Sequence, residues 1–303
     1  MFRLMPYSCF FSTIRPEPRG GGGRQPPVQR SARFSMKLTI SPSKVAYGLT
    51  AVVMVLTLVG LAVRFIELAA GRRFAILMSF DPGGDVSVHT WYSTGALFFC
   101  ALLLGVIGLH AVSRHDRFRW HWLVLGLIFA ALSIDEVACI HERMGGHLAN
   151  LMFGKTHGVF YFNWVIPGMA AVLLVGLPYL KFLAHLPRST GRQIIIAAAI
   201  FVGGAIGVEM FNSQYVEVNG ADNMTFMLGT AFEEFLEMIG IVIFLHALLS
   251  YLARDIFGQE RLTLEIAGTP SEDAVVSTPP RRDQSATSPL PRPAAEMVLV
   301  KPR

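Results

Sequence analysis

The stretch TFMLGTAFEEFLEMIGIVIFLHALLSYL, residues 225–252, decides the fold of this protein because it is long and apolar enough to cross a membrane. A helix of about 20 predominantly apolar residues spans the roughly 30 Å of bilayer hydrocarbon. The same stretch carries three carboxylic acids, Glu233, Glu234 and Glu237, which are costly inside a bilayer. A span that keeps such residues indicates a functional site as well as a fold.

Five further segments of the chain share this length and apolar character. They are residues 45–69, 91–112, 120–141, 159–185 and 193–216. The composition agrees, since 52% of the 303 residues are hydrophobic and 16% are charged, against about 25% charged in soluble domains. We therefore predict an all-α, six-helix transmembrane bundle in the lipid bilayer, and we exclude an ordinary soluble enzyme, a coiled coil and a disordered chain.

Lysine and arginine are distributed unevenly between the two sets of loops. Ten lie on one side of the predicted membrane: Lys37, Lys44, Arg114, Arg117, Arg119, Lys181, Arg188, Arg192, Arg254 and Arg261. Four lie on the other side: Arg72, Arg73, Arg143 and Lys155. Because short basic loops stay in the cytoplasm, we expect both termini to be cytoplasmic. The net charge of +5 then reflects topology and anionic lipid, and the sequence contains no nucleic-acid-binding motif.

The two ends of the chain differ from the spans in composition. The N-terminal end is basic and contains the run Gly20 to Gly23, and residues 266–303 are rich in Pro, Ser and Thr. We expect a disordered segment at 1–44, a six-helix transmembrane domain at 45–258 and a disordered tail at 259–303. Translation could start at Met1 or Met36, and we expect a bacterial inner membrane rather than an organelle membrane.

Acidic side chains recur at a similar depth in different spans. At about 1.5 Å per residue, Asp135, Glu209 and Glu237 lie about 22–25 Å from the predicted cytoplasmic surface. The three acids of the last span also share one helical stripe. Polar stripes at matching depth are best satisfied by facing one another, so we expect one shared site in the outer third of the membrane, toward the periplasm.

So many carboxylates in a poorly solvated site need bound protons or cations. We expect a divalent metal, iron or zinc, held by carboxylate oxygens and imidazole nitrogen. The candidate ligands are Asp135, His141, Glu142, Glu209, Glu233 and Glu237, and the candidate catalytic bases are Glu136 and Glu234. Carboxylate-bridged metal sites in helical bundles use a Glu-x-x-His pattern, which this chain lacks. Its nearest equivalent is Glu136 and His141, five residues apart.

Three interpretations of the acidic cluster stay open. The first is a metal-dependent membrane enzyme that acts on a lipid-soluble or periplasmic small molecule. The second is a proton- or cation-coupled transporter, and the third is a structural polar network without catalysis. A proton relay should cross the membrane, whereas residues 50–60, 98–108 and 243–250 contain no acidic residue. This pattern favours the enzyme over the transporter.

Two motifs in the acidic spans carry a family resemblance. The first is Ser133-Ile134-Asp135-Glu136 followed by His141-Glu142, and the second is Glu233-Glu234-x-x-Glu237-Met238. They resemble motifs of a group of bacterial multi-pass inner-membrane proteins that has no established activity. The resemblance covers the third to the sixth span. It implies a six-helix membrane protein with these motifs, and it assigns no ligand and no catalytic role.

Overall fold

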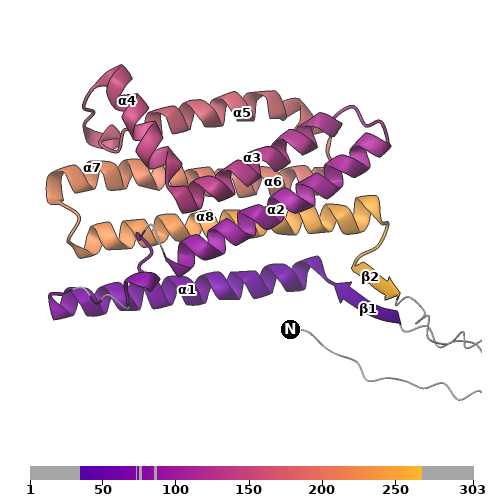
Figure 1. The fold of residues 1–303 in the computed structure, drawn as a ribbon, viewed down its shortest axis with the longest axis horizontal. Coiled ribbons are helices and arrows are strands. Elements are labelled where there is room, and N and C mark those ends of the chain that lie inside the picture. The colour runs from indigo at the N-terminus through magenta and orange to yellow at the C-terminus, as the bar shows by residue number, and fades with distance from the viewer. Residues whose placement is uncertain (1–34, 73, 75–76, 85–86, 268–303) are drawn as a thin grey trace, which may run out of the picture. The chain divides into compact units, whose positions relative to one another are not determined.

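The computed structural model describes residues 35–72, 74, 77–84 and 87–267, and this part of the chain is almost entirely helical (Figure 1). Most of the two predicted disordered tails lies outside the described residues. Two short strands, β1 (Ser35–Ile40) and β2 (Leu262–Ala267), lie within the segments assigned to the tails and pair in a two-stranded sheet. The helices belong to one compact unit, which among the described residues runs from Lys37 to Glu265.

Six stretches of the described chain are helical, long and apolar enough to cross a membrane. They are Pro42–Ala70 (α1), Val88–Ser113 (α2), Arg119–Ala138 (α3), Val165–His185 (α5), Arg188–Asn219 and Met224–Ile256. The fifth stretch consists of α6 (Arg188–Val202), the π-helical turn η4 (Gly203–Val208) and α7 (Glu209–Asn219). The sixth consists of α8 (Met224–Tyr251) and the π-helical turn η5 (Leu252–Ile256). The predicted all-α, six-helix architecture is confirmed, and the protein is a multi-pass membrane protein.

Helix α8 is the centre of the bundle. In the most apolar window of its span 61% of the residues are buried, against 11–33% in the other five spans. It packs against α1, α2, α6 and α7, while α3 packs along α2. In Figure 1, α8 runs between α1 on one side and the α6–α7 segment on the other. The stretch of sequence that carries three acids is therefore the helix with the most protein around it.

Three glycines let the α6–α7 segment approach α8 closely. A Cβ atom on Gly240 would lie 2.8 Å from Cβ of Phe201, and one on Gly229 would lie 2.0 Å from Oδ1 of Asn212. On the α6–α7 side, a Cβ on Gly204 would lie 3.0 Å from a backbone oxygen of α8. Small residues allow helix backbones to approach in membranes. Here they also bring polar side chains of α7 next to the acids of α8.

An apolar core fills the half of the bundle at the predicted cytoplasmic side. Trp122 of α3, Phe182 of α5 and Leu245 of α8 are at most 2% exposed and belong to this core. At the boundary of this core that is farther from the predicted cytoplasmic side, the rings of Phe129 and Phe244 stack with their centroids 4.4 Å apart. The acidic side chains of α3, α7 and α8 lie in the other half of the bundle.

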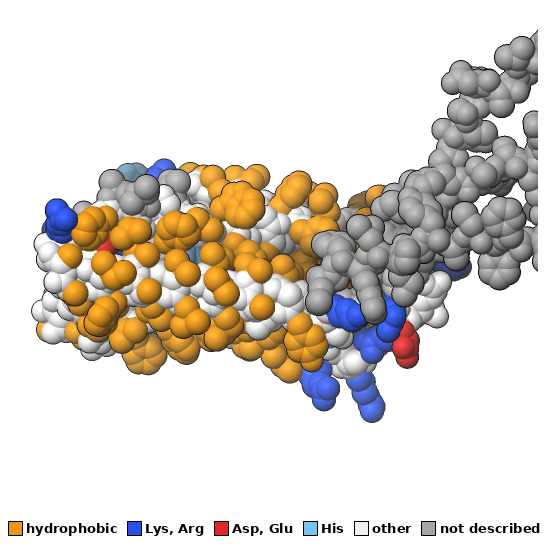
Figure 2. All heavy atoms as spheres, turned by 90° about the horizontal axis from the view of Figure 1, so that it is seen from below, with side chains coloured by type: hydrophobic (Ala, Val, Ile, Leu, Met, Phe, Trp, Pro, Cys, Tyr) orange, Lys and Arg blue, Asp and Glu red, His pale blue; other side chains and the backbone are white. Residues whose placement is uncertain are grey.

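The outer surface of the bundle is apolar, as a lipid-facing surface should be. On α1, Val55, Leu58 and Phe65 are each 59–60% exposed. Figure 2 shows this hydrophobic face, with Lys and Arg side chains gathered at one end. A continuous apolar surface of this extent indicates contact with membrane or protein rather than water.

Candidate functional site

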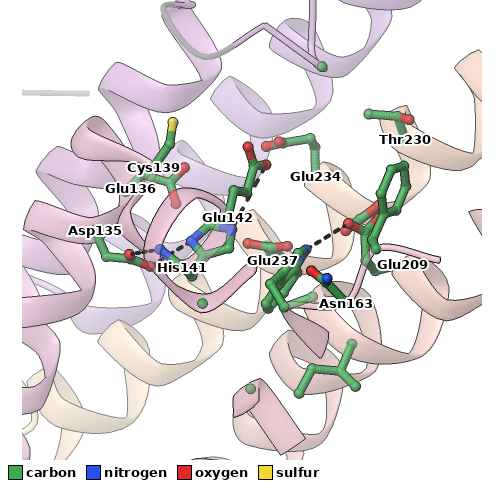
Figure 3. A pocket seen from close by; sticks show the side chains of 18 of the residues that line it. Asp135, Glu136, Cys139, His141, Glu142, Asn163, Glu209, Thr230, Glu234 and Glu237 are labelled. Atoms are coloured by element: carbon green, nitrogen blue, oxygen red, sulfur yellow. Dashed lines mark hydrogen bonds and ion pairs between the residues drawn. The ribbon is translucent and has the colours of Figure 1, made fainter. Parts of the chain in front are cut away.

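The eight residues that the sequence nominated as ligands or bases all line one cavity of about 1170 Å³. They are Asp135, Glu136, His141, Glu142, Glu209, Glu233, Glu234 and Glu237. Figure 3 shows most of them pointing into a common space from helices that are distant in sequence. The fold therefore gathers these side chains, and their roles as ligands or bases stay predictions.

Helix α3 is shorter than predicted, and its end shapes the site. The predicted span 120–141 stops at Ala138, because Cys139 adopts a left-handed backbone conformation with φ of 48°, which is uncommon for a residue with a side chain. The chain continues in a π-helical turn, η2 (His141–Gly145), and a short helix, α4 (Gly146–Phe153). This break at Cys139 allows His141 to contact Asp135 in the last turn of α3.

Asp135 and His141 form a closely bonded pair. The backbone N–H of His141 donates to Oδ1 of Asp135 at 2.8 Å, and Nδ1 of the imidazole lies 2.7 Å from Oδ2. Both carboxylate oxygens are thus engaged by one residue. The other ring nitrogen, Nε2, faces Oε1 of Glu142 at 3.9 Å, as Figure 3 shows. Asp135 therefore fixes the ring so that Nε2 is presented to the cavity.

The surroundings of His141 favour positive charge. Burial by itself lowers the pKa of the imidazole, but the hydrogen bond and charge of Asp135 and the charges of Glu142 and Glu136 raise it more. The net effect is a pKa above the usual value of 6.5. A proton on this ring, or a cation beside it, is stabilised by the same carboxylates.

A second group of acids lies on the α7 and α8 side of the cavity. The indole N–H of Trp164 donates to Oε1 of Glu209 at 3.2 Å, and the amide of Asn212 donates to Oε2 of Glu233 at 2.9 Å. The ring of Trp164 also meets the imidazole of His141, with centroids 4.5 Å apart. Trp164 thus connects the second acidic group to the Asp135–His141 pair.

Glu234 bridges the two groups electrostatically. It lies within reach of the charges of Glu136, Glu142 and Glu209, and Glu237 is within reach of Glu234. In Figure 3 the carboxyl groups of Glu142 and Glu234 point toward the same space. Acids from α3, η2, α7 and α8 therefore form one interacting set.

Acids outnumber permanent cations on the described wall of the cavity. Besides the seven acids among the nominated residues, the wall includes Asp81, and its permanently cationic side chains are Arg64 and Lys155. Arg64 lies 3.4 Å from carboxylate oxygens of both Glu67 and Asp81, so its charge is already balanced. The acids of α3, α7 and α8 need protons or a bound cation to offset their charge.

The side chains as they stand do not make a complete metal site. Among the described residues, no group of three or more His, Cys, Asp or Glu side chains is arranged to hold a metal ion. Asp135 was predicted as a ligand, but both of its oxygens contact His141. One candidate pair of ligands is Nε2 of His141 with Oε1 of Glu142, 3.9 Å apart, and a second is Glu209 with Glu233, whose carboxyl groups are in hydrogen-bond contact.

Sequence reasoning missed two residues of the site. Trp164 precedes α5 and reaches both Glu209 and His141. A tryptophan at a span end is normally read as an interfacial anchor, so the half-buried N–H of Trp164 carried no separate signal in the sequence. Asp81 lies in the loop between α1 and α2; the sequence indicated a turn there whose carboxylates could guide cations, but not the ion pair of Asp81 with Arg64.

Comparison with known proteins identifies the family to which the chain belongs. No curated protein and no solved structure matches the chain. A family model described as "Domain of unknown function (DUF8692)" matches residues 46–252, more than half of the chain and nearly the whole of the helical unit. This agrees with the expected resemblance to a family without an established activity. The chain belongs to the family defined by this domain of unknown function, DUF8692.

Proposed function

We propose that this integral membrane protein is a metal-dependent enzyme whose reaction takes place in the acidic cavity, near the periplasmic face of a bacterial inner membrane. The observation that carries the proposal is the Asp135–His141 pair, which presents Nε2 to Glu142 at 3.9 Å. Histidine ligands in metal sites typically donate their second ring N–H to a carboxylate. Asp135 is therefore the residue that orients the ligand, and His141 and Glu142 are the ligands.

The distance between His141 and Glu142 is compatible with a shared metal ion. Two ligands bound at about 2.0–2.2 Å can lie up to about 4 Å apart on opposite sides of the metal. A further ligand would come from the flexible carboxylates nearby, first Glu234 and then Glu237. Glu209 and Glu233 are the remaining candidates. Mixed imidazole and carboxylate ligands suit iron or zinc.

The cavity also offers residues for the chemistry itself. A bound divalent metal supplies Lewis-acid activation of a substrate or of water. Glu136 and Glu234 line the same cavity and lie within electrostatic reach of each other. Whichever of them is not recruited as a ligand is placed to move a proton as general base. A hydrolytic reaction on a lipid-soluble or periplasmic molecule is the simplest use of these groups.

The two other interpretations fit the arrangement less well. A transporter needs a polar route across the membrane, whereas the buried residues that the structure describes beneath the cavity are mostly apolar or aromatic, with Thr190 and Ser250 as polar exceptions and no buried acid. A purely structural network needs little space, whereas the cavity measures about 1170 Å³. This volume slightly exceeds the usual range for small-molecule sites, about 300–1000 Å³.

Elemental analysis of the full chain purified in detergent tests the proposal. We expect near-stoichiometric iron or zinc in the wild type, and its loss in His141→Gln and Glu142→Gln. For Asp135→Asn we expect metal affinity to fall about 10–100-fold, the usual consequence of losing a residue that orients a ligand. His246→Gln, which changes a histidine in the apolar half of α8, is the matched control and should keep its metal.

Two results would overturn this assignment. One is wild-type protein that contains no iron or zinc and does not take up either metal on titration. The other is metal that stays bound at wild-type affinity in both His141→Gln and Glu142→Gln. Size-exclusion chromatography of each variant distinguishes loss of metal from loss of fold.

A further inference from the structure

Helices α3 and α5 meet at their two ends. At the predicted cytoplasmic end, the hydroxyl of Tyr179 donates to the carbonyl of His121 at 2.8 Å, and Phe182 packs edge-on against Trp122 with centroids 4.8 Å apart. At the other end, His141 and Trp164, which follow α3 and precede α5, are in ring contact. In Figure 1 the two helices converge toward the first of these ends.

Between these two contacts the cavity reaches the outer surface of the bundle. Leu132 and Asp135 on α3 and Gly168, Ala171 and Val172 on α5 line the cavity. Ala171 and Val172 are exposed, Val172 by 38%, and the next residues, Leu173 and Leu174, are 60% and 77% exposed without lining the cavity. Only 11% of the apolar window of α5 is buried, so the cavity wall that α5 provides is a single helix thick and its edge adjoins the outer surface. We call this opening, bounded by Leu132, Asp135, Gly168, Ala171 and Val172, the side window.

The side window lies in the lipid-facing surface. The neighbouring residues on the outer faces of the two helices are large, apolar and exposed: Ile134 by 62%, Val137 by 59%, Leu173 by 60% and Leu174 by 77%. Both helices are membrane spans by length and composition. In a bilayer the side window would face lipid acyl chains, and Asp135, whose side chain is 23% exposed, lines its inner edge.

We propose that the substrate is a membrane lipid with a neutral or cationic polar end, which enters sideways between α3 and α5. The acyl chain lies in the side window against Ala171, Val172 and Leu132, and the polar end reaches Asp135 and His141. The substrate class rests on the proposed enzymatic function, whereas the entry route rests on the window alone.

The charge of the cavity selects the polar end. The described wall carries eight carboxyl side chains, and the charge of Arg64 is balanced by Glu67 and Asp81. One divalent metal offsets two negative charges and leaves the carboxyl groups in excess, so a phosphate group would still meet like charge, which costs free energy in a poorly solvated site. Hydroxyl and amine groups instead donate hydrogen bonds to carboxylates. A neutral hydroxyl-bearing lipid such as a diacylglycerol therefore fits better than phosphatidic acid.

Photolabelling in phosphatidylcholine nanodiscs tests the side window. The full chain is labelled with a diacylglycerol that carries a diazirine near the glycerol end of one chain, and the adducts are mapped by mass spectrometry. We expect adducts on the cavity wall, in residues 132–141 and 201–209. In Ala171→Trp, and in Leu132→Trp on the opposite edge, we expect these adducts to fall about tenfold, because an indole overfills the opening.

Leu174→Trp is the matched control, because Leu174 is on α5 but points away from the cavity. Its cavity adducts should equal those of the wild type. Adducts confined to outward-facing positions, or cavity adducts unchanged in both window variants, would overturn the entry route. Equal cavity labelling by the corresponding phosphatidic acid would overturn the charge selection.

The metal content of the same samples separates the two proposals. Cavity labelling in a protein that binds no metal would leave the entry route intact and remove the metal enzyme. Metal binding without cavity labelling would leave the metal enzyme intact and remove the entry route, and it would indicate a substrate that enters from water.

Discussion

The two halves of helix α8 differ in what surrounds them and in what they contribute to the bundle. From Met224 to Glu237 the helix buries Met227 and Ala231 and supplies three acids to the cavity wall. From Met238 to Tyr251 it buries ten residues and joins the apolar core. One half is surrounded by protein on most sides, and the other borders an open, acidic space.

This contrast separates the part of the bundle that holds the helices together from the part that is free to bind. In a bilayer, helix association depends on close van der Waals packing rather than on transfer from water. That packing is concentrated in the second half of α8 and its neighbours. The acidic half is left with room for a ligand, at the expense of like-charge contacts that a purely structural bundle would avoid.

Truncating Phe182 should have the largest effect on stability, because this side chain is central to the packed half. Phe182 is fully buried and contacts the rings of Phe118, His121, Trp122 and Tyr179. We expect Phe182→Ala to lower the free energy of unfolding by about 3–5 kcal/mol, the usual cost of removing a buried aromatic ring. Equilibrium unfolding in mixed micelles measures it.

Leu180→Ala provides the comparison on the same helix, since Leu180 is 59% exposed to lipid. It should change stability by less than about 0.5 kcal/mol. If Phe182→Ala were as mild as Leu180→Ala, the packed half would not be the source of stability, and the contrast between the two halves of α8 would fail.

We expect an intermediate effect on stability from Gly240→Ala, which lies where α6 crosses α8 at the boundary between the two halves of α8. The Cβ atom that Gly240→Ala adds would lie 2.9 Å from the backbone nitrogen of Phe201 as well as close to its side chain. Overpacking of this kind costs about 1–3 kcal/mol. Gly105→Ala on α2 is the matched control, because a Cβ there has no atom within 4 Å. Its unfolding midpoint should stay at or above that of the wild type.

The sequence predicted the larger features of this molecule for simple physical reasons. The length of apolar runs sets the number of spans, and the cost of burying a charge draws attention to acids within them. Residues such as Glu209 and Glu237 could therefore be assigned to one cavity from depth and helical facing alone. Both features depend on average properties of a helix in a bilayer, which a single sequence contains.

The local geometry of the site could not be predicted in the same way. The end of α3 at Cys139 depends on a positive φ at a residue that is neither Gly nor Asn, and no sequence signal marks such a position. The break at Cys139 brings His141 into contact with Asp135, so under the proposed function Asp135 would orient a ligand rather than bind the metal itself. The side window was equally hidden, because it depends on where α3 and α5 separate rather than on their composition.

The smallest effect on the free energy of unfolding is expected from a substitution in the acidic half of α8. Whether that substitution stabilises or destabilises the protein is what tests the contrast. Glu237→Gln keeps the shape of the side chain and removes an acid that must hold either a charge or a bound proton beside Glu234, Glu136, Glu209 and Asp135. We expect the free energy of unfolding of metal-free protein, measured in EDTA, to rise by about 1 kcal/mol or less, because Gln is neutral in the folded and the unfolded chain and avoids the cost of crowding one more acid into the cluster. A drop of several kcal/mol would mean that the carboxylates form a structural network, as in the third interpretation. Both halves of α8 would then stabilise the fold, and the acidic cavity would no longer be a candidate functional site.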